Sequence, residues 1–362
     1  MERVEKLKKI GKKAGIDAFL VSSEKNMRYF AGFSVLAIER FAGIMIPVGT
    51  SAPIVLVPKL EEEKAKEYSA FKEIRSYDDS ENPAMLLRQV VKVLRMEKAV
   101  FGVEGNLPFK FYRMLLECSP KIRIEDASVF FSQLRRIKSY EELKRMEKAA
   151  SIVAEGIKAG IDFIKPGVSE LAISFQIEKT IKENGGESVP FCIVLSGRHS
   201  ALPHGETSNR NVREKDIVLM DVGAVYEGYY ADITRTVFVG EATKMQTKIY
   251  EIVVKAQETA IKTVKSSVKA EEVDRAARKI IEDAGYGEYF THRTGHGLGL
   301  EVHEEPYIAA GNKTVLKLGM TFTIEPGVYL PGKFGVRVED DIAVSTSEAK
   351  LLSSLSKELL VI

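Results

Sequence analysis

The sequence predicts two domains: an α/β domain over residues 1–135 and an α+β domain with a curved antiparallel sheet over residues 136–362. The length of 362 residues is enough for two hydrophobic cores. Helix and strand patterns alternate in the first part, which is typical of a small α/β domain with a parallel or mixed sheet. The second part places long helices before groups of strands, which favours an antiparallel sheet backed by helices.

The first domain is expected to begin with an amphipathic helix over residues 2–14, because Val4, Leu7, Ile10 and Ala14 fall on one helical face. Runs of β-branched residues and further helical patterns come after it. They predict strands at 18–21, 41–48, 52–58 and 99–104 and helices at 59–68 and 83–96. This domain contains no histidine and no Gly-rich phosphate-binding loop, so we expect its polar clusters to be solvated surface.

The second domain opens with a helix that is expected to begin at Tyr140, because Ser139 and Glu142 form the S-x-x-E pattern of a capping box. Caps and hydrophobic periodicity predict the later elements. The helices are expected at 169–184, 243–266 and 271–284, and the strands at 191–196, 216–225, 229–239, 319–325 and 335–345. A hairpin is expected at Glu227 and Gly228.

Composition and charge exclude several classes of function. The net charge of +2 creates no strong field that would recruit nucleic acid. No apolar stretch reaches the length of about 18 residues that a membrane span needs, and the charged N-terminus lacks the apolar core of a signal peptide. Cys118 and Cys192 fall in different expected domains, which argues against a disulfide. We therefore expect a cytoplasmic protein that binds neither nucleic acid nor a membrane.

Four acidic residues of the second domain stand within or at the ends of apolar runs: Asp221, Asp232, Glu325 and Glu339. A carboxylate rarely enters such a segment without a partner, and unpaired carboxylates close together raise one another's pKa and repel. Hard divalent cations take shells of carboxylate oxygens and imidazole, and His296 lies between the two acidic pairs. We therefore expect two divalent metal ions held by these five residues.

A metal-free network of buried ion pairs is the alternative, because Arg235 and Arg337 lie in the same segments. These arginines can be paired with Asp232 or Glu339. Two arginines do not neutralise four carboxylates together with the two aspartates that come after Glu339, and buried charges tolerate such an imbalance poorly. The charge count therefore favours metal ions.

All five histidines lie in the second domain. His296 stands in T-G-H-G-L-G-L, where glycines permit close approach of the backbone to a ligand, and His292 and His303 flank it. His204 stands in a turn formed by L-P-H-G. We expect these four to serve a functional site and assign His199 a structural role.

Several motifs of the second domain resemble those of the Xaa-Pro peptidases. In chain order they are L-P-H-G, D-V-G, D-I-T-R-T, G-H-G-L-G-L-E-V-H, I-E-P-G-V-Y and V-R-V-E-D. That family comprises prolidase and aminopeptidase P, within the pita-bread metallopeptidases. The resemblance extends over about residues 140–360, and the agreement of separated motifs makes it specific. It implies a pita-bread second domain with two related halves and a creatinase-like first domain.

The resemblance also implies a two-metal centre in which Asp232 and Glu339 bridge both ions. Asp221 matches a further ligand of one ion, and His296 and Glu325 match further ligands of the other. This oxygen-rich set with one imidazole favours Mn, with Co or Zn as alternatives, and leaves Mg and Ca open.

Residues outside the ligand set also match the family. His204, His292 and His303 match its non-ligand active-site histidines, and Arg337 matches an arginine typical of its proline-specific branch. Glu325 is expected to carry a proton from the nucleophile to the leaving nitrogen as well as to bind metal. His303 is expected to stabilise the tetrahedral intermediate, with His204 near the scissile amide.

We therefore expect a dinuclear-metal exopeptidase that removes an N-terminal residue preceding proline, an Xaa-Pro aminopeptidase. Its substrate would be a peptide with proline in second position. The alternative is an Xaa-Pro dipeptidase, since nothing in the sequence decides substrate length. A catalytically silent peptide-binding module and a metal-free creatinase-like hydrolase are further interpretations, against which the complete ligand set argues. We also expect a homodimer, in which the first domain covers or restricts the active site.

Overall fold

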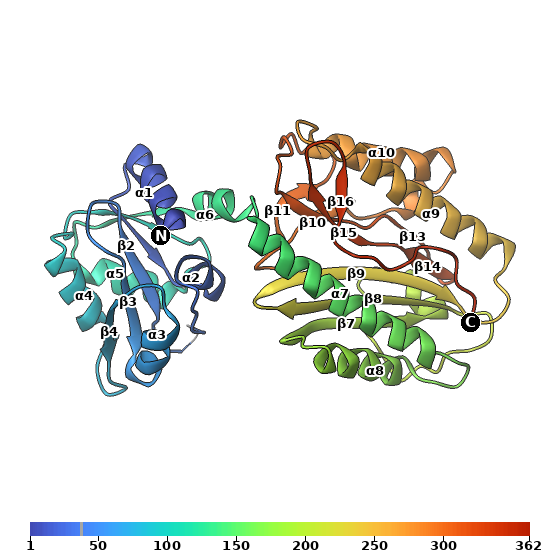
Figure 1. Cartoon of the computed structure of the whole chain (residues 1–362), viewed down its shortest axis with the longest axis horizontal. Helices are drawn as coiled ribbons and strands as arrows, with labels where there is room; N and C mark the ends of the chain where they lie inside the picture. Colours follow the sequence, from blue (N-terminus) through green and yellow to red (C-terminus); the bar gives the residue numbers. More distant parts are fainter. Residues whose placement is uncertain (37–38) are drawn as a thin grey trace. The chain divides into compact units, whose positions relative to one another are not determined.

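The computed structural model describes residues 1–36 and 39–362. The chain divides into two compact units, Met1–Arg135 and Arg136–Ile362, each with its own helices and sheets (Figure 1). The first unit is α/β and the second is α+β, which confirms the fold class expected from the sequence. Within the described ranges, no helix is both long and apolar enough to cross a membrane.

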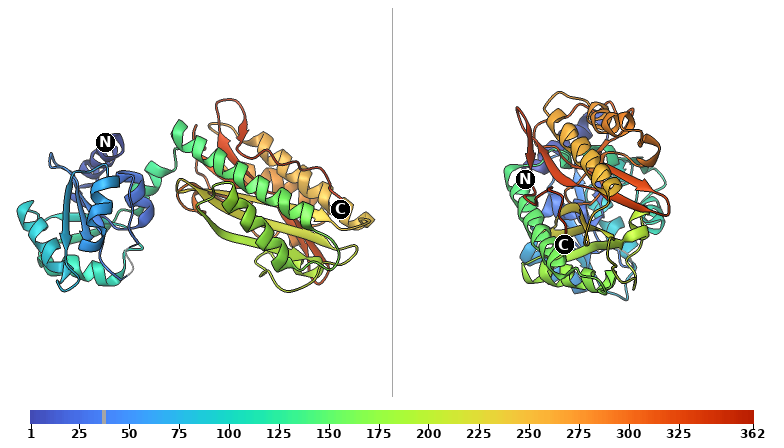
Figure 2. Two further views of the ribbon diagram at one scale, coloured as in Figure 1. Left: turned by 60° about the horizontal axis from the view of Figure 1, so that its bottom comes forward. Right: turned by 90° about the vertical axis from the view of Figure 1, so that its right-hand side faces the viewer.

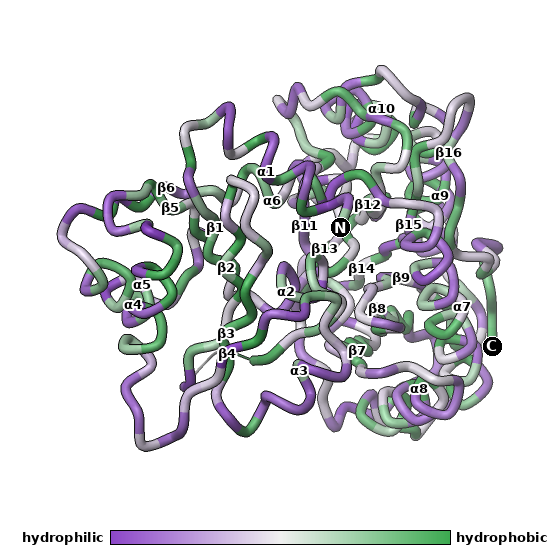
Figure 3. Tube along the Cα trace, turned by 60° about the vertical axis from the view of Figure 1, so that its left-hand side comes forward, coloured by the Kyte–Doolittle hydropathy of each residue, from purple (hydrophilic) through white to green (hydrophobic). Residues whose placement is uncertain are grey.

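The first unit is built on a mixed sheet, which among the described residues has six strands in the order β4-β3-β2-β1-β5-β6. The strands are β1 (Ala18–Val21), β2 (Gly43–Pro47), β3 (Ile54–Pro58), β4 (Glu73–Tyr77), β5 (Val100–Val103) and β6 (Arg123–Asp126). Neighbours pair antiparallel in β1–β2 and β2–β3 and parallel in the remaining pairs. Strands β1, β2, β3 and β5 are buried along their whole length, and hydrophobic residues line them in Figure 3.

The helices of this unit are α1 (Glu2–Ala14), α2 (Glu24–Ala31), α3 (Glu62–Tyr68), α4 (Pro83–Val93), α5 (Phe109–Cys118) and α6 (Ser128–Arg135), with a 3-10 turn at Lys59–Glu61. Helix α1 buries Val4 and Leu7 as expected, whereas Ala14 is exposed. Helices α2, α5 and α6, which have eight to ten residues, were not expected from the sequence. Tertiary packing holds them, as where the ring of Phe131 meets Phe19 edge to face.

Residues 136–362, which the structure describes in full, form three antiparallel sheets in the orders β7-β8-β9, β11-β10-β12-β15-β16 and β13-β14. The strands are β7 (Ser188–Ser196), β8 (Ile217–Tyr226), β9 (Tyr229–Phe238), β10 (Gly295–Gly297), β11 (Glu304–Ile308), β12 (Thr321–Ile324), β13 (Gly327–Leu330), β14 (Phe334–Arg337), β15 (Asp340–Val344) and β16 (Ala349–Leu351). The helices are α7 (Tyr140–Phe163), α8 (Glu170–Glu183), α9 (Lys244–Thr263) and α10 (Ala270–Asp283). The 3-10 turns are Gly197–Ala201 and Gly287–Tyr289.

Two pairs of helices back these sheets (Figures 1 and 2). Helices α7 and α8 pack on β7–β9, and α9 and α10 pack on the strands of the last third of the chain. The second helix of each pair has 14 residues, which fits the two related halves that the resemblance implies. The capping box at the start of α7 is present: Ser139 and Glu142 each accept a hydrogen bond from the other's backbone N–H, at 3.3 and 2.7 Å.

The hairpin formed by β8 and β9 sets the positions of two expected ligands. Its turn at Glu227 and Gly228 takes positive φ angles of 45° and 79°. Asp221 pairs with Thr234, and Asp232 pairs with Gly223 two positions further along. Residues at such diagonal positions share one face of an antiparallel pair. The two aspartates therefore project to the same side of the sheet.

The strand expected at 335–345 is broken in the structure. Strand β14 pairs with β13, and β15 pairs with β12, so the chain changes sheet at Val338 and Glu339. At this point the backbone N–H of Glu339 donates to the carbonyl of Thr234 in β9 at 3.1 Å. The expectation of one continuous strand was wrong because each half takes a different neighbour, and the break brings Glu339 beside β9.

Candidate metal centre

The nine site residues expected from the sequence line one cavity of about 430 Å³ in the second unit. Its walls are formed by Phe191, Ile193, Pro203, His204, Asp221, Asp232, His292, Arg293, His296, Val302, His303, Glu325, Arg337 and Glu339. His199 is not among them, in line with the structural role assigned to it. The cavity therefore collects side chains that are up to 148 positions apart in the sequence, from Phe191 to Glu339.

Each of the five expected ligands comes from the sheet scaffold. Asp221 lies in β8, Asp232 in β9 and His296 in β10. Glu325 comes directly after the last residue of β12, and Glu339 stands at the break between β14 and β15. Strands hold side chains more rigidly than loops do, which suits a site whose geometry must be fixed before a ligand binds.

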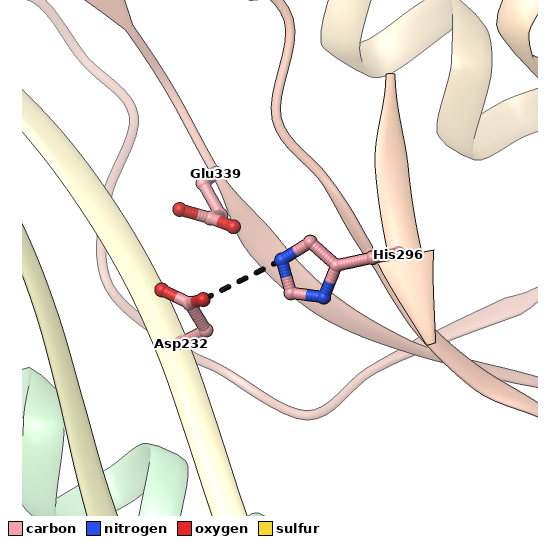
Figure 4. Close-up of side chains that lie close together, drawn as sticks. All are labelled: Asp232, His296 and Glu339. Atoms are coloured by element: carbon pink, nitrogen blue, oxygen red, sulfur yellow. Dashed lines mark ion pairs between the residues drawn. The ribbon is translucent and has the colours of Figure 1, made fainter. Parts of the chain in front are cut away.

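Three of these residues form the closest cluster. One ligand atom from each of Asp232, His296 and Glu339 lies within 4.8 Å of the others, and all three are buried. Figure 4 shows the two carboxylates and the imidazole pointing toward one another. The Nε2 atom of His296 is 3.6 Å from Asp232 Oδ2 and 3.4 Å from Oε1 of Glu325.

Several carboxylate oxygen atoms in and around this cluster are buried and accept no hydrogen bond. They are Asp221 Oδ1, Asp232 Oδ1, Glu339 Oε1 and Asp341 Oδ1. A buried carboxylate oxygen without a partner costs free energy, so native proteins rarely keep one without a donor or a metal ion. The donor set, oxygen atoms with one imidazole nitrogen, is the set that hard divalent cations take. The residues therefore fit the expected metal ions.

The two nearby arginines do not provide the missing partners. Arg337 bonds to Asp221 Oδ2, and Arg235 bonds to Asp340 at 2.7 Å. Within residues 136–362, Asp232 and Glu339 have no Lys or Arg partner. The metal-free network of ion pairs therefore leaves the two central carboxylates without a cation.

Burial raises the pKa of these carboxyl groups. The pKa values of Asp232 and Glu339 lie well above the usual range, first because of burial and then because of neighbouring carboxylates. Burial also raises the pKa of Glu325 to about 7, although Arg337 opposes the shift. The group of acids therefore retains protons when no metal ion is bound.

His296 presents the nitrogen that a metal ion would bind. Its Nδ1 atom lies 3.2 Å from the carbonyl of Gly297, which fixes Nδ1 as the donor. Burial lowers the pKa of His296 to about 3, so the ring is neutral and Nε2 carries a free lone pair. A backbone hydrogen bond that sets the tautomer in this way is the usual support of a metal-binding histidine.

A second chain of hydrogen bonds runs through His292. The Nδ1 atom donates to the carbonyl of Arg293 at 2.8 Å, so Nε2 accepts from the hydroxyl of Tyr329 at 2.8 Å. Burial lowers the pKa of His292 to about 4 and raises the pKa of Tyr329 to about 12, so both groups are neutral. Arg337 donates to the same Tyr329 oxygen at 2.8 Å, which ties His292 to the arginine.

The remaining two histidines face the cavity from exposed loops. The ring centroid of His303 lies 4.2 Å from that of His296, with the rings nearly perpendicular. Burial and the nearby Arg293 lower the pKa of His303. His204 is exposed and lines the cavity together with Pro203.

Sequence analysis missed several supporting residues. Asp341 is fully buried and accepts a hydrogen bond from the backbone N–H of Asp232 at 3.0 Å. The hydroxyls of Thr234 and Thr323 donate to Glu339 at 2.6 Å and to Glu325 at 3.1 Å. The two-residue period of a strand predicts that Asp341 shares a face with Glu339. The threonines left no comparable signal, since their role depends on pairing across sheets.

Family models match both units of the chain. The model described as Metallopeptidase family M24 matches residues 144–346. The model described as Creatinase/Prolidase N-terminal domain matches residues 3–137. Metallopeptidases of this kind act with divalent metal ions, in agreement with the buried carboxylates of the cavity.

Relatives match over the full length. A protein of Pyrococcus horikoshii named Xaa-Pro dipeptidase is 38% identical, and the match covers 99% of each chain. The crystal structure of a recombinant prolidase from Thermococcus sibiricus is 40% identical with a TM-score of 0.93, covering 99% of this chain and 98% of that one. An X-Pro aminopeptidase structure from Thermotoga maritima is 32% identical with a TM-score of 0.89, covering 99% of both. With both domains matched in order and nearly complete, the chain belongs to metallopeptidase family M24.

Proposed function

We propose that the chain is a metal-dependent Xaa-Pro dipeptidase, which hydrolyses the bond between an N-terminal residue and a C-terminal proline. The observation that carries this proposal is the full-length similarity, at 38 and 40% identity, to proteins named as an Xaa-Pro dipeptidase and a prolidase. The motifs do not decide substrate length, and from the sequence alone we expected an aminopeptidase. The full-length similarity favours the dipeptidase.

An Xaa-Pro aminopeptidase is the second candidate. The relative from Thermotoga maritima that bears this name covers 99% of the chain at 32% identity. The two activities share the bond that is cut and differ in the group on the C-terminal side of proline. A dipeptidase must accept a free carboxylate on the proline, whereas an aminopeptidase must accept a continuing chain.

The carboxylates and His296 would hold two divalent ions, and we propose Mn, with Co or Zn as alternatives. The side chains that would hold them are Asp221, Asp232, His296, Glu325 and Glu339. When bound, such ions lower the pKa of a water molecule and neutralise charge that develops on the carbonyl oxygen. Three neighbours keep the ligand side chains in place: Thr234, Thr323 and the backbone of Gly297.

Glu325 is suited to move the proton. It lines the cavity and its Oε1 atom lies 3.4 Å from Nε2 of His296, and a carboxylate placed there can both accept a proton and return it. It would take the proton of the attacking water and deliver it to the proline nitrogen. The leaving nitrogen of an Xaa-Pro bond carries no hydrogen before cleavage, so this delivery is required for a stable amine product.

Two exposed histidines would face the reacting carbonyl. His303 lies beside the ligand His296 and would donate a hydrogen bond to the oxyanion, and His204 would approach the scissile amide. Phe191, Ile193 and Val302 line the same cavity and offer apolar walls to a proline ring.

Arg293 offers a site for the free carboxylate that distinguishes a dipeptide. It lines the cavity, and its guanidinium carbon lies 4.4 Å from the ring centroid of Tyr307. Within residues 136–362 it makes no side-chain hydrogen bond or ion pair, whereas the charge of Arg337 is taken up by Asp221. A guanidinium with free donors binds a carboxylate in a bidentate manner.

Turnover of Ala-Pro, Ala-Pro-Ala and Ala-Ala by the chelated protein, before and after addition of Mn, tests the proposal. We expect Mn-dependent release of alanine from Ala-Pro, little from Ala-Pro-Ala and none from Ala-Ala, measured by mass spectrometry. Comparable cleavage of the tripeptide would favour the aminopeptidase. The homodimer stays a prediction, which light scattering on the purified protein would test.

A further inference from the structure

A buried carboxylate outside the cavity holds together the loop that carries His204. Glu170, the first residue of α8, is fully buried. Its Oε1 atom accepts from the backbone N–H and the hydroxyl of Ser196, both at 2.7 Å. Its Oε2 atom accepts from the backbone N–H and the hydroxyl of Ser208, at 3.1 and 2.6 Å.

These two serines are the ends of one segment. Ser196 is the last residue of β7, and residues 197–207 lead from it to Ser208. The start of α8 also pairs with the far end, since the N–H groups of Glu170 and Leu171 donate to the carbonyls of Arg210 and Ser208 at 3.0 and 3.1 Å. One carboxylate therefore fixes the separation of both ends of the segment.

The middle of the segment reaches the cavity. Pro203 and His204 line it, and Ser200 ties the segment to β14 by accepting from the N–H of Gly335 at 2.9 Å. His204 is exposed, and within residues 136–362 its ring makes no hydrogen bond of its own. The place of the imidazole therefore depends on the backbone of the segment.

We propose that Glu170 is a positioning residue for the peptidase reaction, which acts on the substrate through His204. The inference rests on the proposed function in one respect, namely that His204 faces the scissile amide. Glu170 itself lies behind the segment and is not one of the residues that line the cavity.

The contacts call for a charged group with two equivalent oxygens. Four donors and the N-terminus of α8 stabilise the anion, and among the described residues no Lys or Arg pairs with it. The Nδ1 atom of His199 lies 3.4 Å away on the exposed side. A glutamine fills the same volume but presents an NH₂ group to one serine, so one end of the segment loses its acceptor.

A double-mutant cycle tests the inference. Glu170→Gln is expected to lower kcat/KM for Ala-Pro about tenfold, with the metal content unchanged. In the His204→Ala background the same change is expected to cost less than about twofold, because the imidazole through which it acts is absent. Glu142→Gln is the matched control: Glu142 is also a buried acid in the first turn of a helix, and it bonds to Tyr229 rather than to this segment. Its effect should be equal in both backgrounds.

Amide hydrogen exchange provides a readout that needs no activity. Peptides covering residues 197–208 should exchange faster in the intact Glu170→Gln protein than in the wild type or in Glu142→Gln. Unchanged exchange there would show that Glu170 does not hold the two ends of the segment together, whatever the protein hydrolyses. Faster exchange with equal losses in the presence and absence of His204 would overturn the positioning role. Wild-type protein without any Xaa-Pro turnover would refute the proposed function. The exchange measurement would still decide whether Glu170 holds the segment.

Discussion

Thr234 and Glu339 are joined by two hydrogen bonds, one between backbones and one between side chains. The N–H of Glu339 donates to the carbonyl of Thr234 at 3.1 Å, and the hydroxyl of Thr234 donates to Oε2 of Glu339 at 2.6 Å. The first bond joins β9 to the break between β14 and β15. The second leaves Oε1 of Glu339 as the buried oxygen without a partner.

Replacing Thr234 by Val tests this arrangement. The variant keeps the shape of the side chain and removes the donor, so a buried carboxylate oxygen loses its partner. We expect metal affinity to fall about 10- to 100-fold and the free energy of unfolding to fall by about 1–3 kcal/mol. Thr234→Ser retains the hydroxyl and should stay close to wild type. Calorimetric metal titration and denaturant unfolding measure both quantities, and a Val variant with unchanged metal affinity would refute the supporting role.

The histidines should separate by role. His303→Ala is expected to bind metal ions as the wild type does and to lose turnover by about 100-fold or more, because the group acts on the transition state rather than on the ion. His199→Ala should lose less than about threefold, since His199 lies outside the cavity. Metal analysis and steady-state kinetics check this, and equal losses at the two positions would contradict the assignment.

Arg293→Gln should distinguish the two candidate substrates. If Arg293 receives the free carboxylate, the variant raises KM for Ala-Pro by at least about tenfold, a cost typical of a lost charged hydrogen bond. Hydrolysis of the amide Ala-Pro-NH₂, which lacks the carboxylate, should change little. An equal effect on both substrates would show that Arg293 supports the fold of the cavity instead.

Stability of the metal-free protein should fall as pH rises above about 6.5. In the folded state the pKa values of Asp232 and Glu339 are raised and the pKa of Glu325 is about 7, whereas the unfolded values are near 4. At a pH between the unfolded and the folded pKa values, the folded state therefore binds more protons than the unfolded state. His292 and His296 have lowered pKa values and act in the opposite direction, but only below their unfolded value of about 6.5.

Above that pH the carboxyl groups set the change of stability with pH, and above about pH 8 the thiols of Cys118 and Cys192, whose pKa values burial raises, add to it in the same direction. Each one that is still protonated removes up to about 1.4 kcal/mol of stability per pH unit. Metal ions replace these protons, so the free energy of unfolding of the metal-loaded protein should not fall as the pH rises from about 6.5 to about 8. Guanidinium unfolding of chelated and Mn-loaded protein from pH 6.5 to 8.5 measures the difference. Constant or rising stability of the chelated protein over this range would contradict the buried, coupled carboxylates.

Sequence analysis singled out residues that the fold brings into one cavity, because a carboxylate in an apolar strand is a strong signal by itself. Asp221, Asp232 and Glu339 carry that signal, and glycines mark His296. The ion-pair partners of the nearby arginines could not be predicted from the sequence in this way. Arg235 and Arg337 looked equally able to pair with the central acids, and only the fold directs them to Asp340 and Asp221.

The same limit applies to the elements. Helix α7 and the β8–β9 hairpin were expected because capping and turn residues are local signals. The break at Val338 depends on which strands lie beside β14 and β15, and the sequence around it reads as one strand. Glu170 also bonds to Ser196 and Ser208, which lie 26 and 38 positions further along the chain, beyond the reach of local patterns.

We propose that the buried carboxylates of the cavity hold metal ions that drive peptide hydrolysis. Titrating chelated protein with Mn while measuring bound metal and Ala-Pro turnover tests it most directly. We predict no turnover without metal and full turnover at two bound ions per chain. We also predict loss of both metal and activity in Glu339→Ala, because the variant lacks one of the carboxylates that would hold the ions. Full turnover by metal-free protein, or a Glu339→Ala variant that keeps two ions and wild-type activity, would contradict the account.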